Sequence, residues 1–202
     1  MTHKTAMVLV SILMVLATTS LALAADEQLA KDWLEKGNRY YLNGSYDLAL
    51  ESLDRSLEID SSNARTWNNK GAVLHAMGEY EDALQCYNRS LEIDPDYAQA
   101  WTNRGNALTE LERFSDALES YNRSLEIKPT SADVWNNKGV AMAALGWNQA
   151  ALECYDMSLA IDPEYEEAWG NKGLVLKAIG REEEANDAFA KAGENCPACA
   201  DG

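Results

Sequence analysis

Five tryptophans recur along this chain of 202 residues, and each stands 34 residues after the one before it. A glycine follows every one of them four positions later. A fixed period of this length indicates a repeat architecture, in which each unit buries its apolar face against its neighbours. The fold must therefore be inferred from one unit. The repeated positions are Trp33, Trp67, Trp101, Trp135 and Trp169, with Gly37, Gly71, Gly105, Gly139 and Gly173.

The copy at residues 64–97 predicts two amphipathic helices. Apolar residues from Trp67 to Leu74 follow helical spacing, and Gly78 supplies a C-terminal stop. A second run with the same spacing begins at Tyr80, and Pro95 cannot continue it. Both halves of the unit are thus predicted to be helical.

The unit carries a Trp, a Gly, an Ala, an aromatic residue and a Pro at fixed offsets, and this pattern resembles the tetratricopeptide repeat (TPR). The resemblance covers residues 30 to 199. It implies an all-α fold, an α-solenoid of five helix-turn-helix repeats that forms a right-handed superhelix, with the first helix of each repeat lining the concave side. The expected repeats are 30–63, 64–97, 98–131, 132–165 and 166–199, followed by a tail at 200–202.

Glycine inside a helix costs about 1 kcal/mol relative to alanine, so the repeated glycine needs a structural reason. We expect a close approach of the second helix, and the family resemblance implies that small residues in that helix allow it. These are Ala49, Ala83, Ala117, Ala151 and Ala185. Late in the second helix a serine replaces the usual alanine, and its hydroxyl is expected to bond back to the preceding turn. These serines are Ser56, Ser90, Ser124 and Ser158.

The position before the repeated glycine is basic, where the family usually has leucine. We expect the methylene stem to pack and the charged head to meet carboxylates of the second helix, such as Glu51, Glu119 or Glu153. The alternative is a basic ladder that binds a ligand. The series is Lys36, Lys70, Arg104, Lys138 and Lys172.

An asparagine stands two residues after the tryptophan in the last four repeats. An amide offers both a donor and an acceptor, so a row of amides can pair with the backbone of an extended peptide irrespective of its side chains. The resemblance also implies this role, because some TPR proteins bind peptides through an asparagine ladder at this position. The alternative is that the asparagines only pack. The ladder consists of Asn69, Asn103, Asn137 and Asn171.

Charge along the expected groove changes sign from one end to the other. Lys31 and Arg65 lie at the entrance of the first two repeats, and we include both among the peptide-binding residues. Asp133 and Glu167 occupy the equivalent places in the last two repeats. Some TPR domains hold a C-terminal carboxylate with several inward basic residues, which this chain lacks, so that form of binding is disfavoured.

The first residues break the repeat and are typical of a targeting segment. His3 and Lys4 form a positive head, an apolar stretch follows, and Ala22-Leu23-Ala24 offers a small-x-small cleavage site. We predict a cleaved signal peptide at residues 1–24. The alternative is an uncleaved anchor, because residues 6–25 are long enough to cross a bilayer of ~30 Å. Either reading predicts an extracytoplasmic protein, secreted or held in the cell envelope, that meets the membrane only through this segment.

The composition argues against several classes of function. The net charge is −16 and basic residues do not cluster, which argues against nucleic-acid binding. His75 is the only histidine beyond residue 3, and no catalytic set or metal-ligand spacing is present, so we expect no enzyme activity, cofactor or metal.

Cys86 and Cys154 are expected to be buried thiols. Cys196 and Cys199 form a CPAC motif that we expect to close a small disulfide loop, with redox exchange or an intermolecular bridge as alternatives.

These observations predict an exported interaction module that binds an extended peptide or protein segment on its concave face, as an adaptor or assembly factor. Two other functions stay open. In one, the chain is a thiol-disulfide accessory protein that uses the CPAC motif. In the other, it is a structural spacer that associates with itself end to end. The oligomeric state is open in all three.

Overall fold

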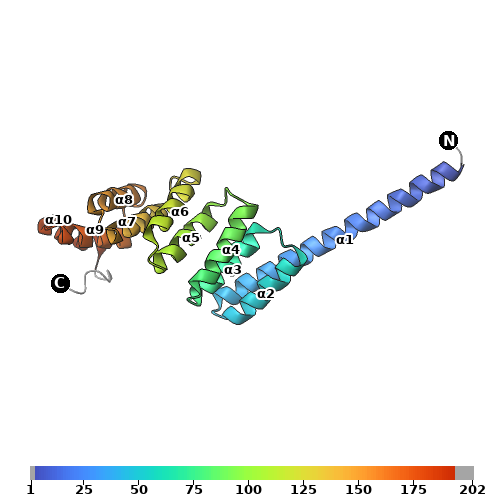
Figure 1. The fold of residues 1–202 in the computed structure, drawn as a ribbon, viewed down its shortest axis with the longest axis horizontal. Coiled ribbons are helices and arrows are strands. Elements are labelled where there is room, and N and C mark those ends of the chain that lie inside the picture. The colour runs from blue at the N-terminus through green and yellow to red at the C-terminus, as the bar shows by residue number, and fades with distance from the viewer. Residues whose placement is uncertain (1–2, 194–202) are drawn as a thin grey trace.

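The computed structural model describes residues 3–193, and their side chains from residue 23 onward. Over this range the chain forms ten α-helices and no strand (Figure 1). The helices are α1 (His3–Leu42), α2 (Tyr46–Ile59), α3 (Ala64–Ala76), α4 (Tyr80–Ile93), α5 (Ala98–Glu110), α6 (Phe114–Ile127), α7 (Ala132–Ala144), α8 (Asn148–Ile161), α9 (Glu166–Ala178) and α10 (Glu182–Ala192).

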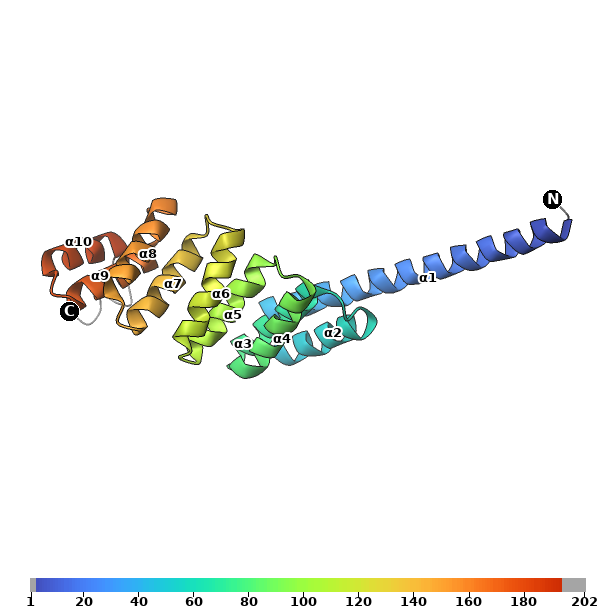
Figure 2. The same cartoon turned by 45° about the horizontal axis from the view of Figure 1, so that its top comes forward.

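The helices form successive pairs that stack along one long axis (Figure 2). We call the odd-numbered members the A helices and the even-numbered members the B helices. Each A helix packs most extensively against the B helix that follows it, and next against the B helix of the preceding pair. The chain is therefore an all-α solenoid of TPR-type repeats, as the sequence predicted.

The repeated glycine is the point of closest approach between the two helices of a pair. A methyl carbon on Gly105 would lie 2.5 Å from a ring carbon of Tyr121, and one on Gly71 would lie 2.6 Å from the ring of Tyr87. Both rings are almost fully buried, so they have nowhere to move. The expected close approach is present, and the atoms that require glycine are chiefly those of the aromatic ring. The helix-B alanines are fully buried beside it: Ala49, Ala83, Ala117, Ala151 and Ala185.

A serine late in each of the first four B helices fastens the pair together. Ser90 Oγ donates to the carbonyl oxygen of Ala64, the first residue of the A helix, at 2.8 Å. The expectation that this hydroxyl bonds to its own preceding turn was wrong, because burial points it across the helix interface instead. The equivalent bonds run from Ser56 to Ala30 at 2.8 Å, from Ser124 to Ala98 at 3.1 Å and from Ser158 to Ala132 at 2.7 Å. In the fifth repeat Ala192 stands at this position.

Helix α1 is much longer than the other A helices. Its C-terminal part is the A helix of the first repeat, and its N-terminal part projects away from the solenoid as a single rod (Figure 1). Across residues 23–193, no helix has the length and apolar character needed to cross a membrane. The signal peptide at 1–24 and the alternative anchor both depend on side chains before that range, so both stay predictions.

Candidate functional site

Three adjoining cavities lie on the face formed by the A helices, and we call them together the inner groove. The first, about 200 Å³, is lined chiefly by Tyr41, Leu42 and Val73 with flanking amides. The second, about 100 Å³, shares Tyr41 with the first and reaches His75. The third, about 260 Å³, also contains His75 and continues to α9. The shared lining residues make the cavities one path along the repeats.

The predicted asparagine ladder lies in this groove and connects neighbouring repeats. Each Nδ2 donates to an amide oxygen on the preceding A helix. The bonds run from Asn69 to Asn38 at 2.7 Å, from Asn103 to Asn68 at 2.9 Å, from Asn137 to Asn106 at 3.1 Å and from Asn171 to Asn136 at 3.0 Å. The acceptor asparagine stands alternately five residues and one residue after the repeat tryptophan. Neighbouring repeat interfaces therefore differ in this bond, and every second interface is alike.

The ladder amides keep part of their hydrogen-bonding capacity. Asn69, Asn103 and Asn137 line the first, second and third cavities, respectively. Their Oδ1 atoms accept from Asn68 at 3.2 Å, from Gln99 at 2.9 Å and from Asn136 at 3.3 Å. An amide has two N–H donors and two lone pairs, so each of these three retains one donor and one lone pair for a ligand.

The two basic residues predicted at the groove entrance lie outside the three cavities. Lys31 Nζ forms an exposed ion pair with Glu27 at 2.7 Å, within the same helix. Arg65 is exposed, and its charge partly offsets the burial that raises the pKa of Tyr97. The ion pair of Lys31 is exposed to solvent and therefore weak, so the binding role of Lys31 and Arg65 stays a prediction.

The acidic end of the groove has a carboxylate that lines a cavity and is held by hydrogen bonds. Glu167 lines the third cavity, and its carboxylate accepts from Asn136 Nδ2 at 3.1 Å and from the Tyr165 hydroxyl at 3.3 Å. Burial and the charge of Glu167 raise the pKa of Tyr165 to about 12, and Asp133 adds to that effect. The two carboxylates predicted at this end, Asp133 and Glu167, therefore both raise the pKa of Tyr165.

The sequence did not single out several groove residues, which lie on the last turns of the A helices. They are Tyr41, His75, Asn106 and Glu110. They vary from repeat to repeat, so no periodic signal marks them. The available signal was their offset from the tryptophan. Positions five and nine residues after it lie three and seven residues after the ladder, on the same helix face, and the position eight residues after it borders that face.

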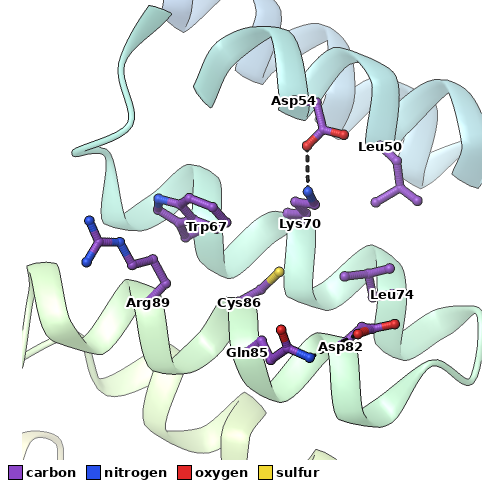
Figure 3. Close-up of a pocket in the computed structure, with 9 residues that line it drawn as sticks. All are labelled: Leu50, Asp54, Trp67, Lys70, Leu74, Asp82, Gln85, Cys86 and Arg89. Atoms are coloured by element: carbon purple, nitrogen blue, oxygen red, sulfur yellow. Dashed lines mark hydrogen bonds and ion pairs between the residues drawn. The ribbon is translucent and has the colours of Figure 1, made fainter. Parts of the chain in front are cut away.

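A larger cavity of about 520 Å³ opens between α2 and α4, over α3 (Figure 3). We call it the outer groove. Leu50, Trp67 and Leu74 form its apolar part, and Lys70 crosses it to Asp54 with an Nζ–Oδ1 distance of 2.6 Å (Figure 3). Arg89, at its edge, is paired with Glu92. Both basic residues already have acidic partners, so the charge that this groove presents without an ion pair is the carboxylate of Asp82.

The residues of the basic series pack against the repeat tryptophans, and Lys70 also lines the outer groove. Each basic head lies over the repeat tryptophan of its own helix, at 4.4 to 5.8 Å from a ring centroid, which is a cation–π geometry. Lys70 and Lys172 pair with Asp54 and Asp156 of the preceding B helix, both at 2.6 Å. The expected pairing with helix-B carboxylates is therefore present in these two repeats, but with aspartates of the preceding B helix rather than with Glu51, Glu119 or Glu153. Arg104 instead donates to Asn88 of the preceding B helix at 2.9 Å and to Ser120 of its own at 2.6 Å.

The tryptophans themselves are half-buried and hold the turns between repeats. Trp101 Nε1 donates to the carbonyl oxygen of Pro95 at 2.8 Å. The same bond occurs from Trp67 to Ser61 at 3.0 Å, from Trp135 to Pro129 at 3.0 Å and from Trp169 to Pro163 at 2.9 Å. Packing and turn closure therefore account for the tryptophan stripe.

The described residues offer little for catalysis or metal binding. Cys86 and Cys154 are buried free thiols, as predicted. Burial raises the pKa of Cys86 to about 11, so its thiol stays protonated near neutral pH. No cluster of three or more potential metal ligands occurs within the part of the chain that the structure describes. Cys196 and Cys199 lie outside the described residues, and their pairing stays a prediction.

Comparison with protein families decides the identity of the repeats. Profiles described as tetratricopeptide repeat match residues 62–130, 102–166 and 166–199, and one described as TPR repeat matches 37–78. The chain is a member of the tetratricopeptide repeat family. Proteins of this family are typically interaction modules rather than enzymes. A comparison with curated protein sequences gave no significant match.

Solved TPR structures share the fold. MamA (residues 41 to the end) from Desulfovibrio magneticus RS-1 superposes with a TM-score of 0.75 at 20% identity, covering 81% of this chain and 92% of that chain. PilF from Pseudomonas aeruginosa gives 0.75 at 22%, covering 84% and 78%. YrrB, a TPR protein with an unusual peptide-binding site, gives 0.68 at 22%, covering 86% and 89%. Identities this low establish the solenoid architecture.

Proposed function

We propose that this chain is an exported TPR module that binds an extended peptide or protein segment along its concave face, as an adaptor or assembly factor. The observation that carries the proposal is the inner groove, in which three cavities adjoin and each contains a ladder asparagine. A backbone that follows the groove would meet a donor and an acceptor at successive repeats.

The fold and its relatives support this class of function. The chain belongs to a family of interaction modules, and YrrB, which has the same architecture, is a TPR protein with a peptide-binding site. Export is supported by the N-terminal sequence alone, whose positive head and apolar stretch end at the small residues Ala22 and Ala24. We therefore place the module outside the cytoplasm, with protein or peptide as its partner.

The ladder asparagines have two roles that one experiment can separate. Replacing Asn103 with alanine removes a ligand-facing amide and also the bond to Asn68 Oδ1. Replacing Asn68 with alanine removes the same inter-repeat bond, and also its bond to Asn69 Oδ1, but leaves Asn103 in the cavity. Asn68 is too buried to reach a ligand. Asn68→Ala is therefore the matched control for Asn103→Ala.

The full chain in mild detergent would be titrated with a peptide library on an alanine–serine scaffold, and the tightest peptide kept for comparison. We expect both variants to lose similar stability, whereas only Asn103→Ala weakens binding, by about threefold to tenfold for one lost hydrogen bond. Equal affinities for Asn103→Ala and Asn68→Ala would contradict a binding role of the ladder. In that case the asparagines only join the repeats.

A further inference from the structure

We propose that the third cavity of the inner groove receives a lysine or arginine side chain of the bound segment. This inference rests on the proposed function and specifies the chemistry of the partner. The cavity has a volume of about 260 Å³, enough for one long side chain, and is formed by residues of four successive repeats. Glu110 and Glu167 line it from α5 and α9, with His75 contributed by α3.

The side chains in this cavity present acceptors without a cation to meet them. Neither Glu110 nor Glu167 forms an ion pair with any residue that the structure describes, and no lysine or arginine lines the cavity. The Tyr121 hydroxyl is already engaged, since it donates to Asn106 Oδ1 at 2.9 Å. Glu167 accepts hydrogen bonds from Asn136 and from the Tyr165 hydroxyl, but like Glu110 it has no cation beside it. The two carboxylates are thus the charged groups left to interact with a ligand.

An independent feature of the same cavity is an orphaned imidazole nitrogen. His75 Nε2 is buried without a hydrogen-bond partner, and no other side-chain nitrogen or oxygen in the described residues shares that condition. Burial lowers the pKa of His75 while the charge of Glu110 acts against it, so the ring is mostly neutral near pH 7. A neutral ring carries one acceptor nitrogen, and leaving a buried polar atom unpaired costs about 1–3 kcal/mol.

The two unpaired carboxylates of this cavity favour a ligand with several donors and a positive charge. A lysine ammonium carries three N–H donors and an arginine guanidinium five, whereas a backbone amide carries one and no charge. A free metal ion is a poorer match, because the groups do not form a cluster of metal ligands. A basic side chain also suits the net charge of −16.

The other two cavities show that this preference is local. The first is mostly apolar, with Tyr41, Leu42 and Val73, and the second has no charged residue in its lining. A segment lying along the groove would therefore place an apolar side chain at the first repeats and a basic one between Glu110 and Glu167. The groove has a different chemistry at each end, which gives the bound segment a direction.

The test uses the same alanine–serine peptide library, with a single varied position occupied by lysine, arginine, norleucine or glutamate. Affinities for the full chain in detergent are measured by fluorescence anisotropy. The informative variant is Glu110→Gln with Glu167→Gln. The matched control is Glu51→Gln with Glu153→Gln, which removes the same charge from exposed positions on the B helices.

We expect lysine and arginine peptides to bind about tenfold tighter than norleucine peptides, as charge-assisted hydrogen bonds at a partly exposed site allow. This preference should disappear in Glu110→Gln/Glu167→Gln and persist in Glu51→Gln/Glu153→Gln. Peptide binding without a charge preference, or a preference that survives in Glu110→Gln/Glu167→Gln, overturns the inference and leaves the proposed function intact. If no peptide binds, the proposed function fails and the inference fails with it.

Discussion

The interface between the two helices of a repeat and the face formed by the A helices follow opposite rules. At the interface, the same contacts recur in nearly every repeat, as with Gly105 against Tyr121 and Ser90 bonded to Ala64. On the A-helix face only the ladder asparagine recurs, while its neighbours change from Tyr41 to His75 to Glu110. Contacts that repeat hold the solenoid together, and positions that vary distinguish one part of the groove from another.

The largest expected effect comes from breaking a repeated contact. Gly105→Ala places a methyl carbon 2.5 Å from the buried ring of Tyr121, and the strain should outweigh the gain in helix propensity by about 2 kcal/mol. Urea unfolding of both forms would measure it. The double variant Gly105→Ala/Tyr121→Ala is the control, because removing the ring removes the clash. Additive losses in the double variant would show that the ring is not the obstacle.

A smaller loss of stability is expected when the serine that joins the two helices of a repeat is replaced. Ser90→Ala removes the 2.8 Å bond to Ala64 and should cost about 1 kcal/mol in the free energy of unfolding. Native-state hydrogen exchange should locate the loss in the second repeat and its neighbours, since repeat arrays are stabilised by nearest-neighbour contacts. The fifth repeat has an alanine, Ala192, at this position, so the reverse substitution Ala192→Ser should stabilise that repeat. Unchanged exchange in both variants would contradict this role.

The sequence was enough to predict the repeated half of this comparison. The helix pairs and the close approach at Gly71 follow from a period of 34, because each position was seen five times. The directions of individual side chains were harder to predict from the sequence. Ser56 was expected to bond within its own helix, whereas it reaches Ala30 across the helix interface. For the basic series, helix-B carboxylates were expected but the individual partners, such as Asp54 for Lys70, were not identified, because the period does not encode the interface geometry.

The groove was only partly predictable for the same reason. The asparagine ladder recurs and was identified, although its bonds between repeats were not foreseen. His75, Asn106 and Glu110 occur at positions whose residue is not the same in every repeat, and only the stacking of four repeats brings them to one cavity with Glu167. Lys31 was predicted to contact a ligand; it forms an exposed ion pair with Glu27, one helical turn earlier, and its binding role stays a prediction.

The smallest expected effect is a pH dependence of the free energy of unfolding that comes from His75 in the inner groove. Because burial lowers the pKa of His75 below its ordinary value of 6.5, the unfolded chain binds the proton more readily. Stability should therefore fall as the pH drops from 6.5 toward the lower folded value, and His75→Gln should lack that part of the decline. Urea unfolding at pH 7 and pH 5 checks this. Identical pH dependence in both proteins would contradict it.

The most direct test of the account asks which face a bound segment touches. A nitroxide-labelled copy of the tightest library peptide would be added to the isotopically labelled chain, and paramagnetic broadening of backbone amides measured. The account predicts strong broadening along the inner groove, at Ala72, Asn106 and Val140, with little at Gln85 and Cys86 of the outer groove. The reverse pattern, with broadening concentrated between α2 and α4, would contradict it.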